Sequence, residues 1–133
     1  MKKMTANIKT LILIVCILLI VIVSGILSQY YLVRSAKKLD SNIETAYISA
    51  GDKQWDNAEK QLDSFEADWK KTKYIWAMLL DHFEIDNIDN SFIKSKEYIK
   101  SEDYSSAVAE LKALRQYVKH IPRKESFSLD NIL

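Results

Sequence analysis

The sequence predicts an all-α protein: an N-terminal transmembrane helix followed by a small antiparallel helical bundle with tetratricopeptide-like hairpins. Three observations predict this class. Only two Gly and one Pro occur in 133 residues, which leaves little turn chemistry for a sheet. No charge occurs from Thr10 to Val33, a stretch longer than the roughly 20 residues needed to cross a bilayer's hydrocarbon core. Beyond it, apolar residues recur at the three-four spacing of amphipathic helices, without sustained period-two alternation.

The chain divides into three parts. Residues 1–33 are expected to form a cytoplasmic N-tail and the transmembrane helix, residues 34–121 the helical bundle, and residues 122–133 a C-terminal docking tail. The short N-tail carries three lysines, as in a signal anchor that stays cytoplasmic. We therefore expect a single pass through the cell membrane, with the bundle extracytoplasmic. Three basic residues flank each end of the apolar run, so the reverse orientation stays open.

Residues that suit a membrane interface follow the apolar run. Tyr30 and Tyr31 fall where an aromatic belt is expected, and Arg34, Lys37 and Lys38 follow at the level of the lipid phosphates. A cleaved signal peptide is the alternative, but the apolar run continues past the small residues that a peptidase would need. The single cysteine lies within this run and cannot form an intramolecular disulfide.

The pattern predicts four helices whose apolar stripes form the core. Their expected ranges are 5–50, 52–84, 87–100 and 102–120, although a helix running straight through the join at 84–87 fits the pattern too. The stripes are expected to contain Trp55, Ala58, Leu62, Phe65, Trp69, Trp76, Leu79 and Phe83, then Ile85, Ile88, Phe92 and Ile99, then Tyr104, Ala107, Leu111, Leu114 and Val118.

Start and stop signals accompany these ranges. Gly51 is expected to break the first helix, and Asp52 to cap the second by accepting from free backbone N–H groups. Ser101, followed by two acidic residues, is expected to cap the fourth helix. Pro122 is expected to end that helix near His120, because proline lacks a backbone N–H.

The two halves of the bundle are similar at an offset of 49 residues. Ala58 aligns with Ala107 and Leu62 with Leu111, each alanine three positions after an aromatic residue. A small alanine at this place is typical of tetratricopeptide-type hairpins, in which two helices approach closely. Two hairpins are fewer than the three repeats that a solenoid needs, so the sequence favours a compact bundle.

Charge and motifs exclude several functions. Three of the 19 basic residues and none of the 18 acidic ones precede position 34, so residues 34–133 carry a net charge of −2. This part therefore lacks the basic footprint of a nucleic-acid-binding protein. The sequence contains no Gly-rich phosphate loop, no nucleophile elbow and no Cys–His pairing outside the apolar run. We expect no catalytic residues, no cofactor and no enzymatic activity.

One histidine lies among carboxylates in the stretch "DHFEIDNID". On a helix, His82, Asp86 and Asp89 fall at i, i+4 and i+7 of one face, where a histidine and a carboxylate could hold a divalent metal. A membrane-tethered sensor of a metal or small ligand is therefore the alternative function. Two or three ligands on one helix are few, and the sequence favours a solvated face on which His82 pairs with Asp86.

The C-terminal tail is apolar for a chain end. Phe127, Leu129, Ile132 and Leu133 are unsuited to free exposure, whereas most tails are polar and fray. We expect the tail, including Asn131, to fold back into a groove of the bundle or to dock on a partner.

Several segments together resemble a known family. They are the N-terminal span, "WDNAEKQLDSFEADWKKTKYIW", "DHFEIDNIDNSFIKSKEYIKSEDYSSAVAELKALRQYVKHI" and the terminal "SLDNIL". They resemble the small bacterial membrane proteins of domain-of-unknown-function family 4363, most specifically through His82-x-Glu84-x-Asp86 and Asn131-Ile132-Leu133. No activity is established for that family, so none follows from the resemblance, which implies a membrane partner of the YetF-like kind.

These observations predict a membrane-anchored, non-enzymatic interaction or accessory protein of the bacterial cell envelope. Its partners would be the lipid bilayer and a membrane or envelope protein. The sequence leaves open whether the chain also associates with a second copy of itself.

Overall fold

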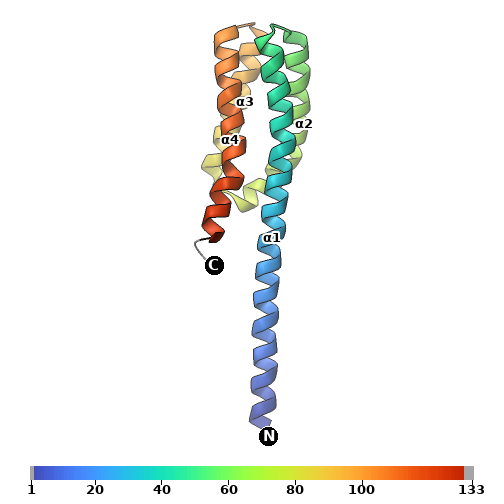
Figure 1. Ribbon diagram of the computed structural model, residues 1–133, viewed down its shortest axis with the longest axis vertical. Coiled ribbons are helices and arrows are strands. Elements are labelled where there is room, and N and C mark those ends of the chain that lie inside the picture. The colour runs from blue at the N-terminus through green and yellow to red at the C-terminus, as the bar shows by residue number, and fades with distance from the viewer. Residues whose placement is uncertain (1, 131–133) are drawn as a thin grey trace.

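The protein is a bundle of four helices from which the first helix projects as a long rod (Figure 1). The computed structural model describes residues 2–130, with side chains for residues 5–123. Neighbouring helices run in opposite directions. The predicted all-α class is confirmed, since residues 2–130 contain helices and turns but no strand. The helices are α1 (Lys2–Gly51), α2 (Trp55–Leu79), α3 (His82–Lys100) and α4 (Tyr104–Asp130).

Helix α1 combines two environments in one uninterrupted element. Its 50 residues extend for about 75 Å at 1.5 Å per residue. In the N-terminal half, the large apolar side chains from Ile8 to Leu27 are exposed, and burial begins at Leu32. The exposed half is long and apolar enough to cross a membrane. It is compatible with a membrane anchor or a signal sequence.

The four helices pack in a ring around one core. Helix α1 contacts α2 and α4, and α3 completes the ring between them. Phe65 lies at the centre of an aromatic group, with its ring centroid 6.3 Å from Trp69 and 5.2 Å from Phe92. Trp69 in turn meets Trp76 edge-on at 5.6 Å. These rings join α2 to α3 through the middle of the bundle.

The predicted apolar stripes form most of this core, but three of their members are exposed. Phe83 is 67% exposed, Tyr104 43% and Leu79 36%. All three lie at a helix end next to a turn, where the neighbouring helices no longer cover them. The periodicity therefore predicts the buried face correctly and extends it too far at the ends.

The two turns at the far end of the bundle share one backbone conformation. Lys53 and Glu102 have φ values of 57° and 55°, the left-handed region that non-glycine residues rarely adopt. In each turn the following N–H reaches five residues back, from Gln54 to Ser49 at 2.8 Å and from Asp103 to Tyr98 at 3.0 Å. This is the Schellman pattern of helix ends. The equivalent positions differ by 49 residues, so the turns match the offset seen in the sequence.

Two predicted caps are wrong because these turns are longer than expected. Asp52 lies within the first turn, and Gln54 precedes α2 without any side-chain cap. Ser101 ends α3 instead of starting α4. Asp103 takes the capping role, since its carboxylate accepts from the backbone N–H of Ser106 at 3.2 Å. A left-handed residue follows each expected cap directly, and it moves each helix start by two or three residues.

The join between α2 and α3 lies earlier than predicted. The expected boundary at 84–87 is wrong, because α2 ends at Leu79 and α3 begins at His82. Leu80 is extended, with φ −122° and ψ 162°. The carboxylate of Asp81 accepts from the backbone N–H of Phe83 at 3.2 Å, which satisfies one of the free donors at the start of α3. Asp81 therefore sets the boundary.

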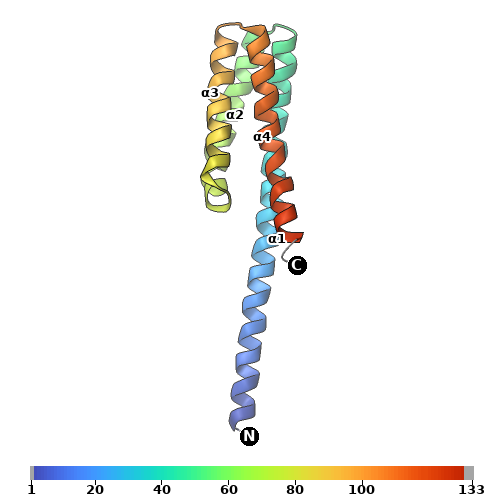
Figure 2. The same ribbon diagram turned by 90° about the vertical axis from the view of Figure 1, so that its left-hand side faces the viewer.

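The prediction that Pro122 ends the last helix is also wrong. Helix α4 passes through Pro122 and continues to Asp130. Proline removes one backbone donor and still allows helical φ on its own residue, so the helix resumes. Beyond the α2–α3 turn, this end of α4 extends along the direction of α1 (Figure 2). The expected docking tail is thus a continuation of α4 through Phe127 and Leu129, whereas Asn131, Ile132 and Leu133 lie outside the described residues.

Candidate functional site

The structure does not bring the predicted metal residues together as a binding set. His82 and Asp86 are exposed on α3. The carboxylate of Asp89 accepts from Trp69 Nε1 at 2.7 Å and forms an ion pair with Lys73. Among residues 5–123, no three His, Cys, Asp or Glu side chains form a group that could hold a metal ion. One of the three expected ligands is therefore already engaged in joining α2 to α3.

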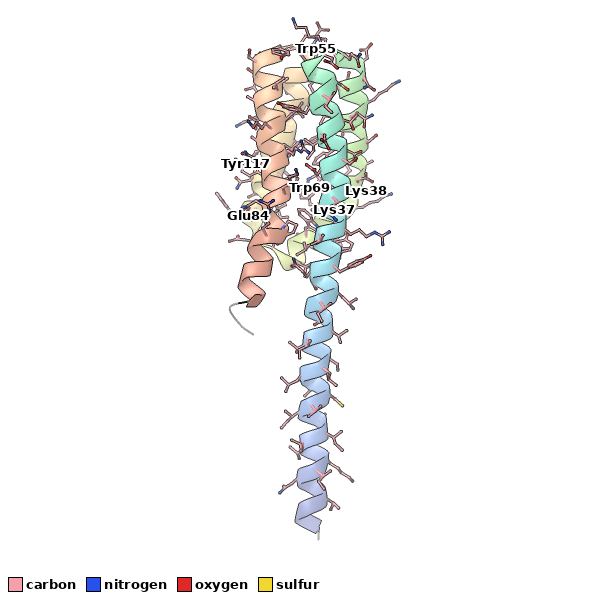
Figure 3. The ribbon with its side chains drawn as sticks, viewed as in Figure 1. Lys37, Lys38, Trp55, Trp69, Glu84 and Tyr117 are labelled. Atoms are coloured by element: carbon pink, nitrogen blue, oxygen red, sulfur yellow. The ribbon has the colours of Figure 1, made fainter. Side chains whose placement is uncertain are left out.

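The predicted interface residues lie where α1 enters the bundle. Tyr30 and Arg34 are exposed, and so is Lys37 (Figure 3). Tyr31 is half-buried and packs against the core. Lys38 forms an ion pair with Asp68 of α2, with 3.0 Å between Nζ and Oδ1. Lys38, one of the predicted interface residues, thus helps to hold α1 and α2 together.

A groove runs between α1 and α2 at this level. It has a volume of about 480 Å³. Four of its residues are charged, with Arg34, Lys38 and Lys71 against the single carboxylate of Asp68. The remaining lining residues are Tyr31, Ser35, Leu39 and Thr72. Tyr31 lines the end of the groove nearest the apolar half of α1, and the walls of the groove carry a surplus of positive charge.

Hydrogen bonds fix the polar walls of this groove. Burial alone would raise the pKa of Asp68, but the hydrogen bonds from Lys38 and Asn42 lower it below its usual value. Asp68 is consequently ionised at neutral pH. Ser35 Oγ accepts from Trp76 Nε1 at 2.9 Å and donates to the carbonyl of Tyr31 at 2.6 Å.

Exposed apolar side chains gather at the same end of the bundle. The turn between α2 and α3 lies on the side where α1 leaves the bundle (Figures 1 and 2). Met78 and Phe83 are each 67% exposed beside this turn, and Tyr74 is 75% exposed one helical turn before Met78. Since Trp76 contacts Ser35, these side chains lie at the level at which α1 becomes apolar.

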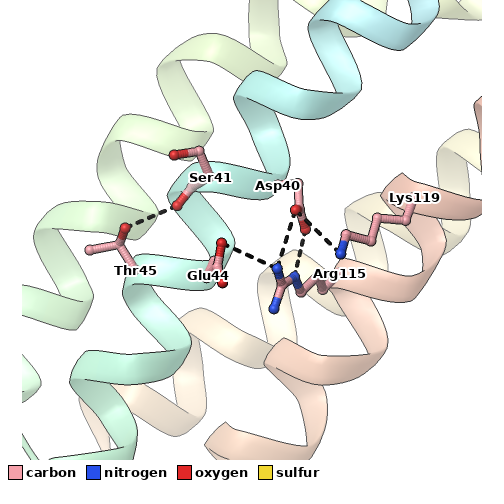
Figure 4. Close-up of polar contacts among 6 residues, drawn as sticks. All are labelled: Asp40, Ser41, Glu44, Thr45, Arg115 and Lys119. Carbon is pink, nitrogen blue, oxygen red and sulfur yellow. Dashed lines mark hydrogen bonds and ion pairs between the residues drawn. The ribbon is translucent and has the colours of Figure 1, made fainter.

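A cluster of charges holds α4 against α1. Arg115 Nε donates to Asp40 Oδ1 at 2.7 Å, Lys119 approaches Asp40 at 3.6 Å, and Glu44 lies 3.2 Å from the same guanidinium (Figure 4). The hydrogen bond to Asp40 raises the pKa of Arg115. Closer to the apolar half, the amide of Gln29 donates to the carbonyl of Pro122 at 3.1 Å. These contacts align α4 with α1.

A second groove lies between α3 and α4. It has a volume of about 440 Å³, and its lining includes Glu84, Tyr117 and His120 (Figure 3). The carboxylate of Glu84 and the imidazole of His120 alone do not make a catalytic site, which would also need a nucleophile or an electrophilic group beside them.

Sequence reasoning missed half of the charged groove. It identified Arg34 and Lys38 from their place after the apolar run, but it assigned no role to the lysines of α2. Lys71 and Asp68 belong to the groove only because α2 packs antiparallel to α1. These two residues could have been identified only from the register between α1 and α2, which depends on the helix caps and turns.

The family prediction is confirmed by comparison with known proteins. A family model described as a domain of unknown function (DUF4363) matches residues 26–132. This range includes the bundle and the junction with the apolar half of α1. No curated protein and no solved structure matches the chain. The chain belongs to the DUF4363 family.

Proposed function

We propose that the protein is a membrane-anchored, non-enzymatic accessory protein of the bacterial cell envelope. Helix α1 crosses the cell membrane once, with its N-terminus in the cytoplasm and the bundle outside. One observation carries this proposal: the apolar half of α1 is exposed and continues without a break into the bundle. In water, an apolar surface of this size is unfavourable, and a bilayer removes it.

Alkaline carbonate extraction tests the anchor. The full-length protein should stay in the membrane pellet, and the mass of the mature chain should include the N-terminal residues. A chain that is released by carbonate, or one that is cleaved within the apolar run, would contradict the proposal, since α1 would then act as a signal sequence.

Cysteine labelling tests the orientation. Cys16 is the only cysteine, so Cys16→Ser provides a background free of thiols. On this background, Ser64→Cys, which is exposed on α2, should react in intact cells with a maleimide that cannot cross the membrane. Thr5→Cys should react only after the cells are opened. The reverse pattern would place the bundle in the cytoplasm.

The exposed apolar side chains at the α2–α3 turn support contact with the bilayer. With α1 across the membrane, Met78 and Phe83 lie at the lipid interface, where apolar side chains are favourable. An environment-sensitive fluorophore on Phe83→Cys should shift to the blue when the protein enters vesicles. The same fluorophore on Ile93→Cys is the matched control, because Ile93 is 57% exposed on the same helix but lies farther from the turn. Equal shifts at both positions would contradict this contact.

The proposed partner is another membrane or envelope protein. Large apolar side chains that stay exposed away from the α2–α3 turn, such as Ile48 and Ile93, support an interaction role. The resemblance to the family makes a YetF-like membrane protein the first partner to test. Crosslinking in native membranes, followed by purification in mild detergent, should recover a partner in amounts comparable with the protein itself. Repeated recovery of the protein alone would contradict a heterologous partner and favour self-association.

The likeness to tetratricopeptide-type hairpins remains a prediction. Ala58 of α2 and Ala107 of α4 are both completely buried, and both follow turns of the same conformation. These features support a related hairpin architecture within the four-helix bundle.

A further inference from the structure

We infer that the groove between α1 and α2 binds the phosphate of an anionic phospholipid, of the phosphatidylglycerol class. The inference rests on the proposed function, because it requires α1 to cross the bilayer. It adds a defined lipid-binding site, formed by residues of two helices, to a general attraction between basic residues and the membrane surface.

The height of the groove agrees with the level of the phosphates. Tyr30 and Tyr31 lie just before the end of the uncharged run at Val33. Arg34 lies about 6 Å further along α1, at 1.5 Å per residue. Each headgroup layer of a bilayer is roughly 5–8 Å thick. With the tyrosines at the hydrocarbon boundary, the guanidinium of Arg34 therefore falls among the phosphates, and acyl chains meet the exposed apolar residues of α1 below it.

The charges of the groove are incompletely neutralised. Asp68 is already bound by Lys38 and Asn42. Among the described side chains, Arg34 makes no hydrogen bond or ion pair, and Lys71 contributes only a longer-range attraction to Asp68. Two cations are thus available at the walls of one groove. A phosphodiester supplies the missing negative charge.

The arrangement also indicates which headgroup fits. A guanidinium binds phosphate oxygens in a fixed, often bidentate geometry, which suits Arg34 at the lower end. Lys71 lies higher, because α2 runs antiparallel to α1 and Trp76 of α2 is the residue opposite Ser35. A headgroup that extends beyond its phosphate would meet Lys71, Asp68 and Thr72. The positive surplus disfavours choline and ethanolamine headgroups, whereas the hydroxyls of glycerol are compatible with these side chains.

Lipid retention by the full-length protein in mild detergent tests the inference. The protein is mixed with phosphatidylglycerol or phosphatidylcholine, and bound lipid is counted by native mass spectrometry. Arg34→Gln and Lys71→Gln should each weaken phosphatidylglycerol binding by about fivefold, the effect of roughly one favourable charge. Lys37→Gln is the matched control: it removes the same charge from the same region of α1, but Lys37 does not line the groove. Circular dichroism checks that all variants keep their helix content.

Three results would overturn the inference. Equal weakening by all three substitutions would show attraction to the basic surface in general. Equal retention of the two lipids would show that the groove does not select a headgroup of net negative charge, since both lipids contain the phosphodiester. Competition by soluble glycerophosphoglycerol, which has the headgroup phosphodiester without acyl chains, as strong as by the lipid would show a site for a free phosphodiester. Failure of the anchor is detected separately by carbonate extraction, and the lipid count in detergent does not depend on it.

Discussion

Trp76 should be among the most important residues for the stability of the bundle. Its side chain is completely buried, and its indole N–H donates to Ser35 at 2.9 Å. Replacing a buried tryptophan by alanine costs about 4 kcal/mol, because apolar contacts are lost and a cavity remains. The whole free energy of unfolding of a domain of this size is about 5–15 kcal/mol. We therefore expect Trp76→Ala to remove a large part of it.

The assay is chemical denaturation of the full-length protein in mild detergent, followed by far-ultraviolet circular dichroism. Tyr74→Ala is the matched control, since Tyr74 is an aromatic residue of the same helix and is 75% exposed. It should change the free energy of unfolding by no more than about 0.5 kcal/mol. If Trp76→Ala cost no more than Tyr74→Ala, the packing of α2 against α1 described above would be refuted.

A double-mutant cycle separates the hydrogen bond from the packing. Ser35→Ala leaves the indole N–H buried without its acceptor, which costs about 1–3 kcal/mol. Trp76→Phe removes the donor and keeps most of the aromatic volume. Combined, the two substitutions should cost about 1 kcal/mol less than the sum of the single effects. Strict additivity would show that this hydrogen bond does not contribute to stability.

The remaining predictions concern charges and one turn. The hydrogen bond from Lys96 lowers the pKa of Glu66 below 4.5. The stabilisation of the bundle by ionised Glu66 is therefore complete above pH 4.5 and is lost as the pH falls through the lowered pKa. The difference in unfolding free energy between wild type and Glu66→Gln should shrink over this range, and a difference that grows in acid would contradict this. Arg115→Met should cost about 2 kcal/mol, because the half-buried Asp40 loses charged hydrogen bonds; unchanged denaturation would contradict the role of this pair. Glu102→Gly should stabilise the bundle by about 1 kcal/mol, since its φ of 55° favours glycine; a lower melting temperature would contradict that reasoning.

The apolar stripes could be predicted from the sequence because burial follows helical periodicity. Leu62, Phe65 and Trp69 occupy the expected face and are buried. Helix ends were less predictable, because they depend on single backbone conformations. Lys53 adopts a left-handed φ that is normally typical of glycine, and nothing in its side chain indicates this. The sequence also contains no signal for whether a helix resumes after proline, as it does at Pro122.

The candidate site was only partly predictable for a different reason. Arg34 and Lys38 could be identified from their distance to the apolar run alone. Lys71 is far from them in the sequence and reaches the groove only through the antiparallel register of two helices. The same holds for Asp89, whose carboxylate contacts Trp69. On an isolated helix such a carboxylate could bind a metal, but in the bundle it forms a hydrogen bond and an ion pair with side chains of the neighbouring helix.

The unbroken course of α1 through Gly51 has a mechanical consequence. No hinge separates the apolar half of α1 from the folded part, so in the proposed membrane arrangement the folded part stands at a constant height instead of diffusing on a tether. From Tyr31 to Gly51 this height is about 30 Å, at 1.5 Å per residue. A partner in this arrangement must present its binding surface within that distance of the bilayer, and a tilt of α1 in the membrane would move the far turns sideways.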